Sequence, residues 1–499
     1  MRLKKLLEQL EYAFIQPADE FETMEIQKVV YDSRKAGKGD LFVCLSGLRA
    51  DGHAFIREAS EKGVSVFVVE KLVQSGEMLR FPAKATVILV KDSREALAHI
   101  SAAYFGNPAD KLKIIGVTGT KGKTTVTWLL HTLLEGAGHK SGLIGTIETI
   151  IGKEKIPSEN TTPESFTIQE YFAKMVEEGC EYAVMEVSSQ GIKQKRVEGI
   201  SFLAAVFTNF GEDHIGPGEH ENVEEYRYYK SRLFRQCRIG IGNLDDLQCS
   251  YMFRHARCEK YGYTCQKDYF SYLSDRKEKV LTAERIHFQV EQGVPVTYFS
   301  VCGEEFVLQM PGLFNVYNAL AALQTLHVLG MNIFERKEEI RLVNVRGRME
   351  LVSTQKNIAC YIDYAHNAMS LKEVLMTIRS YHPRRIILVF GCGGNRSASR
   401  RTEMGETAGR LADLTVITSD NPRFEKPDEI MEDIREGLRR TKGDYRMVED
   451  RREAVRFALD EARPGDVVLI AGKGHETYQE IQGVKYHMDD RELVKKGEQ

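Results

Sequence analysis

Residues 114–125 are Ile114-Ile115-Gly116-Val117-Thr118-Gly119-Thr120-Lys121-Gly122-Lys123-Thr124-Thr125, an apolar run that passes into a glycine-rich turn and then into a helical pattern. Backbone N–H groups in such a turn, with the positive end of the following helix, would hold phosphate oxygens. Lys123 would neutralise the terminal phosphates, and the Thr124 hydroxyl would bind Mg²⁺, which prefers oxygen ligands. The stretch therefore predicts a strand, a phosphate loop and a helix.

The spacing in this loop differs from that of a standard P-loop. Two residues separate Gly119 from Gly122, where the standard motif has four. Glycine-rich turns also join strands to helices without any ligand, so a structural turn is the alternative interpretation.

Composition narrows the class of protein. A chain of 499 residues is long enough for about three domains, and its 42% apolar and 28% charged residues are typical of a globular enzyme. The net charge is −3 with no long block of one sign, which argues against a nucleic-acid partner. No apolar run is long enough to span a bilayer, and the first residues lack the apolar core of a signal peptide. We expect a cytoplasmic protein without a membrane partner.

The nine cysteines form no CxxC pair. Cys249, Cys258 and Cys265 come nearest to a cluster, so a zinc site is an alternative. Reduced thiols in a reducing compartment explain the pattern more simply.

The chain as a whole predicts an α/β fold with three domains. Residues 1–108 form a small α/β domain, because short apolar runs alternate there with polar turns before Pro108 ends a helix. Residues 109–338 form a central domain with a mostly parallel sheet, which continues into an antiparallel hairpin between Cys249 and Met310 and a helix that we expect Asn315 to cap. Residues 339–499 form a C-terminal Rossmann-like domain.

Polar loops follow the predicted strands of both larger domains. In open α/β sheets, ligands bind at the carboxyl ends of the strands, so these loops predict two binding crevices. Glu186 is the most informative residue in the central domain, because a charge inside a buried strand is costly unless it is paired or bound to a metal. Four loops mark the C-terminal crevice: Asp363-Tyr364-Ala365-His366-Asn367, Gly391-Cys392-Gly393-Gly394-Asn395-Arg396, Ser419-Asp420-Asn421-Pro422-Arg423 and Gly472-Lys473-Gly474-His475-Glu476.

Taken in order, these motifs resemble the Mur ligase family, the ATP-dependent enzymes that add amino acids to the peptidoglycan precursor. The resemblance spans nearly the whole chain. It is carried by Gly119 to Thr125, Asn160-Thr161-Thr162-Pro163, Met185-Glu186-Val187-Ser188-Ser189, Asp213-His214, Tyr229-Lys230, Arg346-Gly347-Arg348, Asp363-Tyr364-Ala365-His366 and Asp420-Asn421-Pro422-Arg423.

Within the family, the sequence is most similar to the ligases that extend UDP-N-acetylmuramoyl-L-alanyl-D-glutamate by a diamino acid. The resemblance implies that ATP phosphorylates the D-glutamate γ-carboxylate and that an amine of the diamino acid then attacks the acyl phosphate. The tetrapeptide ending in Arg423 is similar to the version associated with meso-diaminopimelate, whose second carboxylate suits an Arg fork. The implied amino-acid site is Arg396, Asp420, Asn421, Pro422, Arg423, Gly472 and Glu476.

The resemblance also implies the phosphoryl-transfer site. Lys123 and Arg348 would stabilise the transferring phosphate, and Mg²⁺ ions would be held by Thr124, Glu186, His214 and Lys230, the last as a carbamate formed with carbon dioxide. An unmodified lysine cannot bind a cation, and an exposed surface lysine is the alternative for Lys230. The implied ATP contacts are Gly119, Thr120, Lys121, Gly122, Lys123, Thr124, Thr125, Asn209, Asn315 and Asp363.

The implied site for the UDP precursor lies across the first two domains. Its residues are Ser33, Asn160, Thr161, Thr162, Ser188, Gln194 and Arg196. The Ser33 loop would bind the uridine end. The implied partners are small molecules alone, and we expect a monomer whose domains close during turnover.

Departures from the family pattern leave the added amino acid open. Gln190 replaces a common His, Asn367-Ala368-Met369 replaces Thr-Pro-Asp, and residues 213–220 are more similar to lysine-adding relatives. The alternatives are a ligase for L-lysine or another diamino acid, a ligase similar to folylpolyglutamate synthase, and a nucleotide-dependent switch without catalysis.

Overall fold

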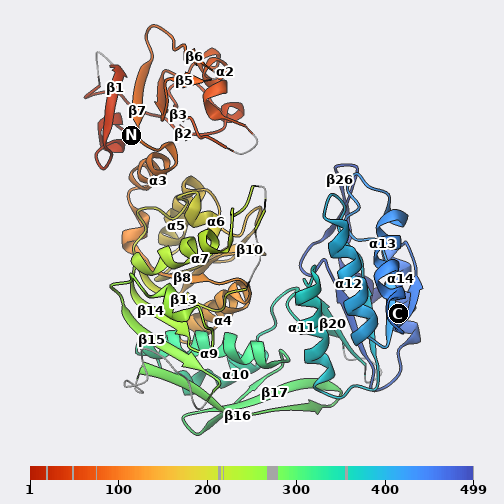
Figure 1. Cartoon of the computed structure of the whole chain (residues 1–499). Coiled ribbons are helices and arrows are strands. Elements are labelled where there is room, and N and C mark those ends of the chain that lie inside the picture. The colour runs from red at the N-terminus through yellow and green to blue at the C-terminus, as the bar shows by residue number, and fades with distance from the viewer. Residues whose placement is uncertain are drawn as a thin grey trace. The chain divides into compact units, whose positions relative to one another are not determined.

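The structure is a computed structural model that describes residues 1–17, 21–47, 50–74, 76–211, 215–216, 218–266, 279–353 and 358–497. The chain divides into two compact units, residues 1–262 with 270–280 and residues 263–269 with 281–499. Helices and strands alternate in both units, which confirms the predicted α/β class (Figure 1).

The first unit begins with a five-stranded sheet in the order β1-β7-β4-β3-β2. Its inner strands are parallel, and β1 pairs with β7 in the antiparallel sense. Alternate residues of each inner strand enter two separate apolar clusters, so both faces of the sheet are buried. The elements are α1 (Leu3–Leu6), β1 (Tyr12–Gln16), β2 (Val29–Val30), β3 (Leu41–Val43), α2 (Ile56–Glu61), β4 (Val66–Val69), β5 (Val73–Gln74), β6 (Glu77–Met78), β7 (Thr86–Val90) and α3 (Ser93–Tyr104).

The same unit continues into a sheet built around the phosphate loop. β9, β12, β8, β13 and β14 are parallel neighbours, with β10 and β11 added antiparallel beyond β9. The carboxyl ends of β8, β12 and β13 therefore meet at one edge, as the sequence predicts. The elements are β8 (Lys113–Thr118), α4 (Lys123–Gly136), β9 (Ser141–Ile144), β10 (Glu148–Ile151), β11 (Glu154–Pro157), α5 (Ser165–Glu177), β12 (Tyr182–Glu186), α6 (Ser189–Lys193), β13 (Phe202–Phe207), α7 (Val223–Arg232), β14 (Cys237–Asn243), α8 (Cys249–Met252) and β15 (Glu259–Thr264).

The second unit contains the predicted antiparallel segment, with three strands: β16 (Val280–Glu291), β17 (Val294–Val301) and β18 (Glu304–Leu308). Phe306 and Leu308 are buried, but Phe288 and Val290 of β16 are exposed, so the apolar alternation in β16 does not mark its core face.

The prediction that Asn315 caps the following helix is wrong. Helix α9 (Leu313–Val328) begins after Gly312, whose φ of 103° lets the chain turn into the helix there. Asn315 is already inside the first turn, where its side-chain amide donates to the Pro311 carbonyl at 2.9 Å. Helix α10 (Lys337–Leu342) follows.

The C-terminal sheet has the order β19-β20-β24-β21-β22-β23, and β19 is its one antiparallel strand. Apolar clusters cover both of its faces. The four polar loops predicted for this domain therefore follow the neighbouring strands β20, β24, β21 and β22 and lie at one edge of the sheet. The elements are β19 (Glu350–Ser353), β20 (Ala359–Asp363), α11 (Ala368–Arg379), β21 (Ile386–Phe390), α12 (Ala398–Leu411), β22 (Leu414–Ile417), α13 (Pro427–Arg439), β23 (Asp444–Met447), α14 (Arg451–Glu461), β24 (Val467–Ala471), β25 (Tyr478–Ile481), β26 (Val484–His487) and α15 (Asp490–Gly497).

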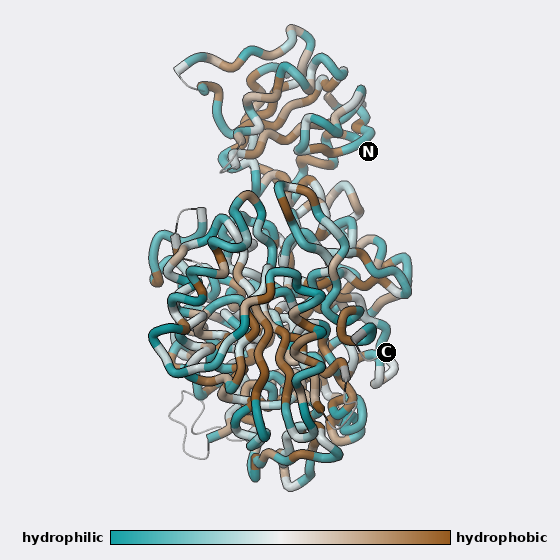
Figure 2. Tube along the Cα trace, turned by 90° about the vertical axis from the view of Figure 1, so that its right-hand side faces the viewer, coloured by the Kyte–Doolittle hydropathy of each residue, from teal (hydrophilic) through white to brown (hydrophobic). Residues whose placement is uncertain are grey.

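Hydropathy follows this architecture. Strands through the body of the fold are mainly hydrophobic, whereas the turns between elements are mainly hydrophilic (Figure 2). Within the described residues, no helix combines the length and the apolar character needed to cross a membrane. All nine cysteines are free thiols.

Candidate functional site

Gly119 lets the phosphate loop pass close to the end of β13. A Cβ on Gly119 would lie 1.9 Å from Thr208 Oγ1 and 3.1 Å from the Asn209 backbone nitrogen, and the φ of Gly119 is 154°. A side chain at position 119 would have to displace the Thr208 hydroxyl and adopt a backbone conformation that favours glycine. Gly122, with φ of 81°, then starts α4, so the loop N–H groups and the helix N-terminus lie together as predicted.

Asn209 holds the phosphate loop through both its side chain and its backbone carbonyl. The Lys121 N–H donates to Asn209 Oδ1 at 2.9 Å, and Asn209 Nδ2 donates to the Lys121 carbonyl at 3.2 Å. The Thr120 N–H donates to the Asn209 carbonyl at 2.9 Å. Asn209, which the sequence places at the ATP site, therefore shapes the phosphate loop directly.

Two lysines converge on the carbonyl oxygen of Gly119. Lys123 Nζ donates to it at 2.9 Å, and Lys230 Nζ donates to it at 2.7 Å. Lys230 is 1% exposed and lies over the Tyr226 ring at 4.4 Å from its centroid. The alternative of an exposed surface lysine at position 230 is therefore wrong, and the lysine lies at the phosphate loop.

Glu186 is buried at the end of β12 and receives three hydrogen bonds. Thr124 Oγ1 and Thr146 Oγ1 donate to its Oε2 at 3.1 and 3.0 Å, and the Thr146 N–H donates to its Oε1 at 2.7 Å. Glu186 is 1% exposed. This buried carboxylate lies beside the phosphate loop and has neutral donors around it. Its negative charge is therefore suited to bind a cation.

The oxygen atoms of Thr124 and Glu186 fit a magnesium ion. Mg²⁺ takes hard oxygen ligands and keeps several waters, so one carboxylate and one hydroxyl are a suitable protein share. In the described part of the chain, no group of three or more His, Cys, Asp or Glu side chains could hold a metal by itself. His214, a predicted metal ligand, lies outside the described residues.

Three of the predicted precursor-binding residues border Glu186. Thr161 Oγ1 lies 3.0 Å from Thr146 Oγ1, and Thr162 Oγ1 donates to the Glu186 carbonyl at 2.9 Å. The Ser188 N–H donates to Thr162 Oγ1 at 3.0 Å. The phosphate loop and this part of the predicted precursor site are therefore continuous.

The other predicted precursor residues lie further from this centre. Arg196 is fixed by Nη1, which donates to the Thr162 carbonyl at 2.8 Å, and by an ion pair with Glu164 at 2.8 Å. Ser33 is buried in the first sheet's loop, where its Oγ donates to Glu58 at 3.1 Å. Asn160 is exposed and Gln194 is half-buried.

His220 is a buried residue that the sequence analysis did not single out. Its Nε2 lies 2.9 Å from Ser189 Oγ, and its ring packs against Tyr226 and Tyr229. Burial lowers the pKa of His220. No sequence signal marks it, because a histidine in a polar loop has the same appearance whether it is buried or exposed.

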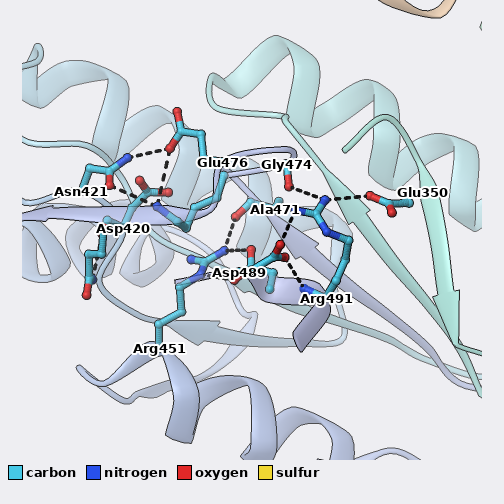
Figure 3. Close-up of polar contacts among 12 residues, drawn as sticks. Glu350, Asp420, Asn421, Arg451, Ala471, Gly474, Glu476, Asp489 and Arg491 are labelled. Atoms are coloured by element: carbon cyan, nitrogen blue, oxygen red, sulfur yellow. Dashed lines mark hydrogen bonds and ion pairs between the residues drawn. The ribbon is translucent and has the colours of Figure 1, made fainter. Parts of the chain in front are cut away.

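In the second unit, Asn421 and Glu476 point toward each other among the loops that follow β22 and β24 (Figure 3). Asn421 Nδ2 donates to Glu476 Oε2 at 2.8 Å, and the buried Lys473 donates to Asn421 Oδ1 at 3.1 Å. A Cβ on Gly472 would lie 2.7 Å from Asp420 Oδ2. The structure thus brings together four predicted residues, Asp420, Asn421, Gly472 and Glu476, and adds Lys473.

Several charged groups surround Glu476. Burial raises the pKa of Glu476 and the nearby Asp420 raises it further, while Lys473 and Asn421 act in the opposite direction. His475 is different, because burial and the cations Arg348, Arg346 and Arg491 lower its pKa to about 3. His475 is therefore neutral at neutral pH.

Arg423 is held by contacts to two neighbouring segments. Its Nη1 donates to the Gly394 carbonyl at 2.7 Å, and its Nε donates to Glu480 at 3.3 Å. Its φ of 52° is unusual for a residue with a side chain and reflects pairing of this segment with β25. Pro422 is buried beside it, whereas Arg396 is exposed.

Asp363 and Arg348 lie at the end of β20. Asp363 accepts hydrogen bonds from the Met349 and Ala365 N–H groups at 2.7 and 2.8 Å, so it fixes two loops. The Arg348 guanidinium stacks on the Tyr364 ring at 4.8 Å from its centroid. These residues and Asn315 belong to the second unit.

Comparison with known proteins gives matches along nearly the whole chain. Three family models match in order: the Mur ligase family catalytic domain at residues 25–105, the Mur ligase middle domain at 117–326, and the Mur ligase glutamate ligase domain at 347–474.

Two relatives are named UDP-N-acetylmuramoyl-L-alanyl-D-glutamate–2,6-diaminopimelate ligase. The protein of Caldanaerobacter subterraneus subsp. tengcongensis is 41% identical, over 95% of this chain and 94% of its own length. The protein of Clostridium botulinum is 40% identical, over 99% of both chains. A solved structure with the same name is 26% identical, covers 100% of this chain and 98% of its own, and has a TM-score of 0.68.

Proposed function

The chain belongs to the Mur ligase family, and from this premise we propose that it is an ATP-dependent, ADP-forming amide ligase of peptidoglycan precursor synthesis. It joins meso-diaminopimelate to the D-glutamate γ-carboxylate of UDP-N-acetylmuramoyl-L-alanyl-D-glutamate. One observation carries this proposal: relatives named for this ligation match the chain over nearly its full length at about 40% identity.

The chemistry has two steps. An oxygen of the γ-carboxylate attacks the γ-phosphorus of ATP, the bond to ADP breaks, and an acyl phosphate forms. A neutral amine of the diamino acid then attacks the acyl carbon, phosphate leaves with the carboxylate oxygen, and the amine loses a proton. Lys123 at the phosphate loop and Arg348 stabilise charge on the transferring group, since phosphoryl transfer depends mainly on positioning and electrostatics.

Thr124 and Glu186 would hold a magnesium ion, which would neutralise charge on the phosphates when bound. Their hydrogen-bonded oxygens support this assignment. Carbamylation of Lys230 would place an anionic oxygen beside the loop, and the burial of Lys230 against Gly119 supports it. His214 remains a proposed ligand from the family resemblance alone.

The precursor would lie across the Thr161, Thr162 and Ser188 cluster, with its carboxylate facing the phosphate loop. The hydrogen bonds that join this cluster to Glu186 support the placement. Arg196, Gln194 and Asn160 would contact the muramoyl portion, and Ser33 would contact the uridine end.

The diamino acid would bind in the C-terminal crevice. Glu476 and Asp420 suit an ammonium group, and Arg423 suits the second carboxylate that meso-diaminopimelate has and L-lysine lacks. The bonds that orient Arg423 support this role. A lysine-adding ligase is the second candidate, favoured by Gln190 and by residues 213–220.

Three further statements belong to the proposal. The three-domain division at 1–108, 109–338 and 339–499 is supported by the separate family matches. We also place the protein in the cytoplasm, because its ATP and UDP-linked substrates are cytoplasmic small molecules, and we propose that it is a monomer.

Release of ADP tests the function directly. The enzyme is supplied with the UDP-muramoyl dipeptide, ATP and Mg²⁺, while meso-diaminopimelate, L-lysine and L-ornithine are varied. We expect turnover with meso-diaminopimelate alone. Equal turnover with L-lysine would favour the second candidate, and ATP hydrolysis that ignores every amino acid would contradict a ligase.

A further inference from the structure

Lys473 is a fully buried cation in the loop that follows β24, with 0% of its surface exposed. Lysine is rarely buried without a charged or polar partner, because removing an ammonium group from water is costly. Its Nζ donates to Asn421 Oδ1 at 3.1 Å and lies 3.5 Å from Glu476 Oε2. It also lies 5.6 Å from the centroid of the Tyr478 ring.

The flanking glycines explain how Lys473 reaches this position. A Cβ on Gly472 would lie 2.7 Å from Asp420 Oδ2, and one on Gly474 would lie 2.7 Å from Tyr364 Cβ. Both glycines have positive φ, 106° and 54°. Since neither carries a side chain, the loop packs closely against the neighbouring strand ends and turns Lys473 inward.

The contacts of Lys473 fix the orientation of the Asn421 amide. Asn421 Oδ1 accepts from Lys473 Nζ at 3.1 Å and from the Glu480 N–H at 2.9 Å, while Nδ2 donates to Glu476 at 2.8 Å. A flipped amide would set its NH₂ group against two donors and its oxygen against a carboxylate. The network therefore allows one orientation of the amide.

We propose that Lys473 is a positioning residue of the diamino-acid site: it fixes the Asn421 amide and holds Glu476 as the anion that accepts the ammonium group of the substrate. This inference rests on the proposed function. It assigns to Lys473 a role in amino-acid binding that is separate from the phosphoryl chemistry.

The charges around Glu476 predict how the pH dependence of the reaction changes when Lys473 is replaced. Burial and Asp420 raise the pKa of Glu476, and Lys473 opposes them. Without the Lys473 ammonium, Glu476 takes up a proton at higher pH and no longer attracts a cationic substrate. The acid limb of kcat/KM for meso-diaminopimelate therefore moves to higher pH when the charge at position 473 is lost.

Two variants separate charge from hydrogen bonding. Lys473→Met keeps much of the apolar stem and removes both the charge and the donor, whereas Lys473→Gln keeps a donor and removes the charge. Lys485→Met is the matched control, because exposed Lys485 lies over the same Tyr478 ring at 4.2 Å from its centroid. Each purified full-length variant is compared with wild type by far-UV circular dichroism, melting temperature and ADP release from pH 5.5 to 9.

We expect Lys473→Met to raise the KM for meso-diaminopimelate by at least about tenfold while kcat and the KM for ATP change by less than about threefold. The acid limb shifts upward by about one pH unit in both Lys473 variants. Lys485→Met behaves as wild type.

Several results would overturn the inference. They are a folded Lys473→Met enzyme with wild-type KM and acid limb, equal effects on the KM values of all three substrates, and a Lys485→Met variant with the same defect. Loss of fold in both Lys473 variants would assign the residue to stability instead. If ADP release by the wild-type enzyme did not depend on meso-diaminopimelate, the proposed function would be wrong. That result differs from a failure of the Lys473 inference, which concerns the variants alone.

Discussion

Replacing Glu186 by Gln separates the stability of the fold from the chemistry of the phosphate loop. The substitution keeps the side-chain length and removes the charge. Three donors from Thr124 and Thr146 face the carboxylate, so the glutamine amide loses charge-assisted bonds and sets its NH₂ group against a donor. Loss of these bonds costs about 1–3 kcal/mol.

A second contribution to the free energy of unfolding opposes the loss of these hydrogen bonds. Glu186 is 1% exposed, and the hydrogen bonds to its carboxylate come from the neutral donors of Thr124 and Thr146. Removing a buried charge of this kind relieves a desolvation cost of several kcal/mol. This gain is roughly as large as the loss from the broken hydrogen bonds. We therefore expect the free energy of unfolding of Glu186→Gln to stay within about 2 kcal/mol of wild type.

Activity should respond very differently. A bound metal supplies several kcal/mol of transition-state stabilisation, and a loss of about 4 kcal/mol lowers kcat roughly 1,000-fold. ADP release is measured across a Mg²⁺ titration, and urea denaturation is followed in parallel by circular dichroism. Glu181→Gln is the control, because Glu181 precedes the same strand and its half-exposed carboxylate forms ion pairs with Lys113 and His139.

A folded Glu186→Gln enzyme that keeps kcat within tenfold of wild type and needs no more Mg²⁺ would show that Glu186 does not hold a catalytic metal. A collapse of the fold would contradict the energetic part, since it would show that the carboxylate serves stability first.

Three more predictions follow from the geometry. Lys230→Met should lower the rate of ADP release at least about 100-fold, and removing bicarbonate from wild-type enzyme should lower its activity reversibly. Activity that survives both changes would exclude the carbamate. Arg423→Ala should raise the KM for meso-diaminopimelate by about 100-fold and leave the KM for ATP unchanged, which initial rates measure; an unchanged amino-acid KM would remove the specificity argument. His475, whose pKa burial lowers to about 3, binds protons more readily when unfolded, so its contribution to stability is complete above pH 6.5 and is lost as the pH falls toward 3. Melting curves should show that His475→Gln loses less stability than wild type between pH 7 and 5, by on the order of 2 kcal/mol; parallel losses would contradict the shift.

Much of the architecture could be predicted from sequence because buried parallel strands are continuous apolar runs. β8, β12, β21 and β24 are such runs, and each is followed by a glycine-rich or polar loop. The edge of the sheet where those loops meet follows from parallel pairing alone. The Glu186 centre was visible for the same reason, as one acid in an otherwise apolar strand.

Other features depend on contacts that sequence patterns do not contain. Asn315 has a capping side chain, but the backbone at Gly312 decides where α9 begins. The apolar residues Phe288 and Val290 alternate like a core face, but this end of β16 is exposed on both faces, and the buried residues of the strand are Leu281 and Ala283. Lys473 is charged and fully buried, and only the tertiary placement of Asn421 and Glu476 explains it.

An isotope experiment tests the central claim most directly. The UDP-muramoyl dipeptide is prepared with ¹⁸O in the D-glutamate γ-carboxylate and is converted with ATP, Mg²⁺ and meso-diaminopimelate, and the released phosphate is analysed by mass spectrometry. Ligation through an acyl phosphate transfers one labelled oxygen to each phosphate, and labelled phosphate should form in step with the amide product. Unlabelled phosphate, or labelled phosphate formed equally with L-lysine, would contradict a diaminopimelate ligase that works by this route.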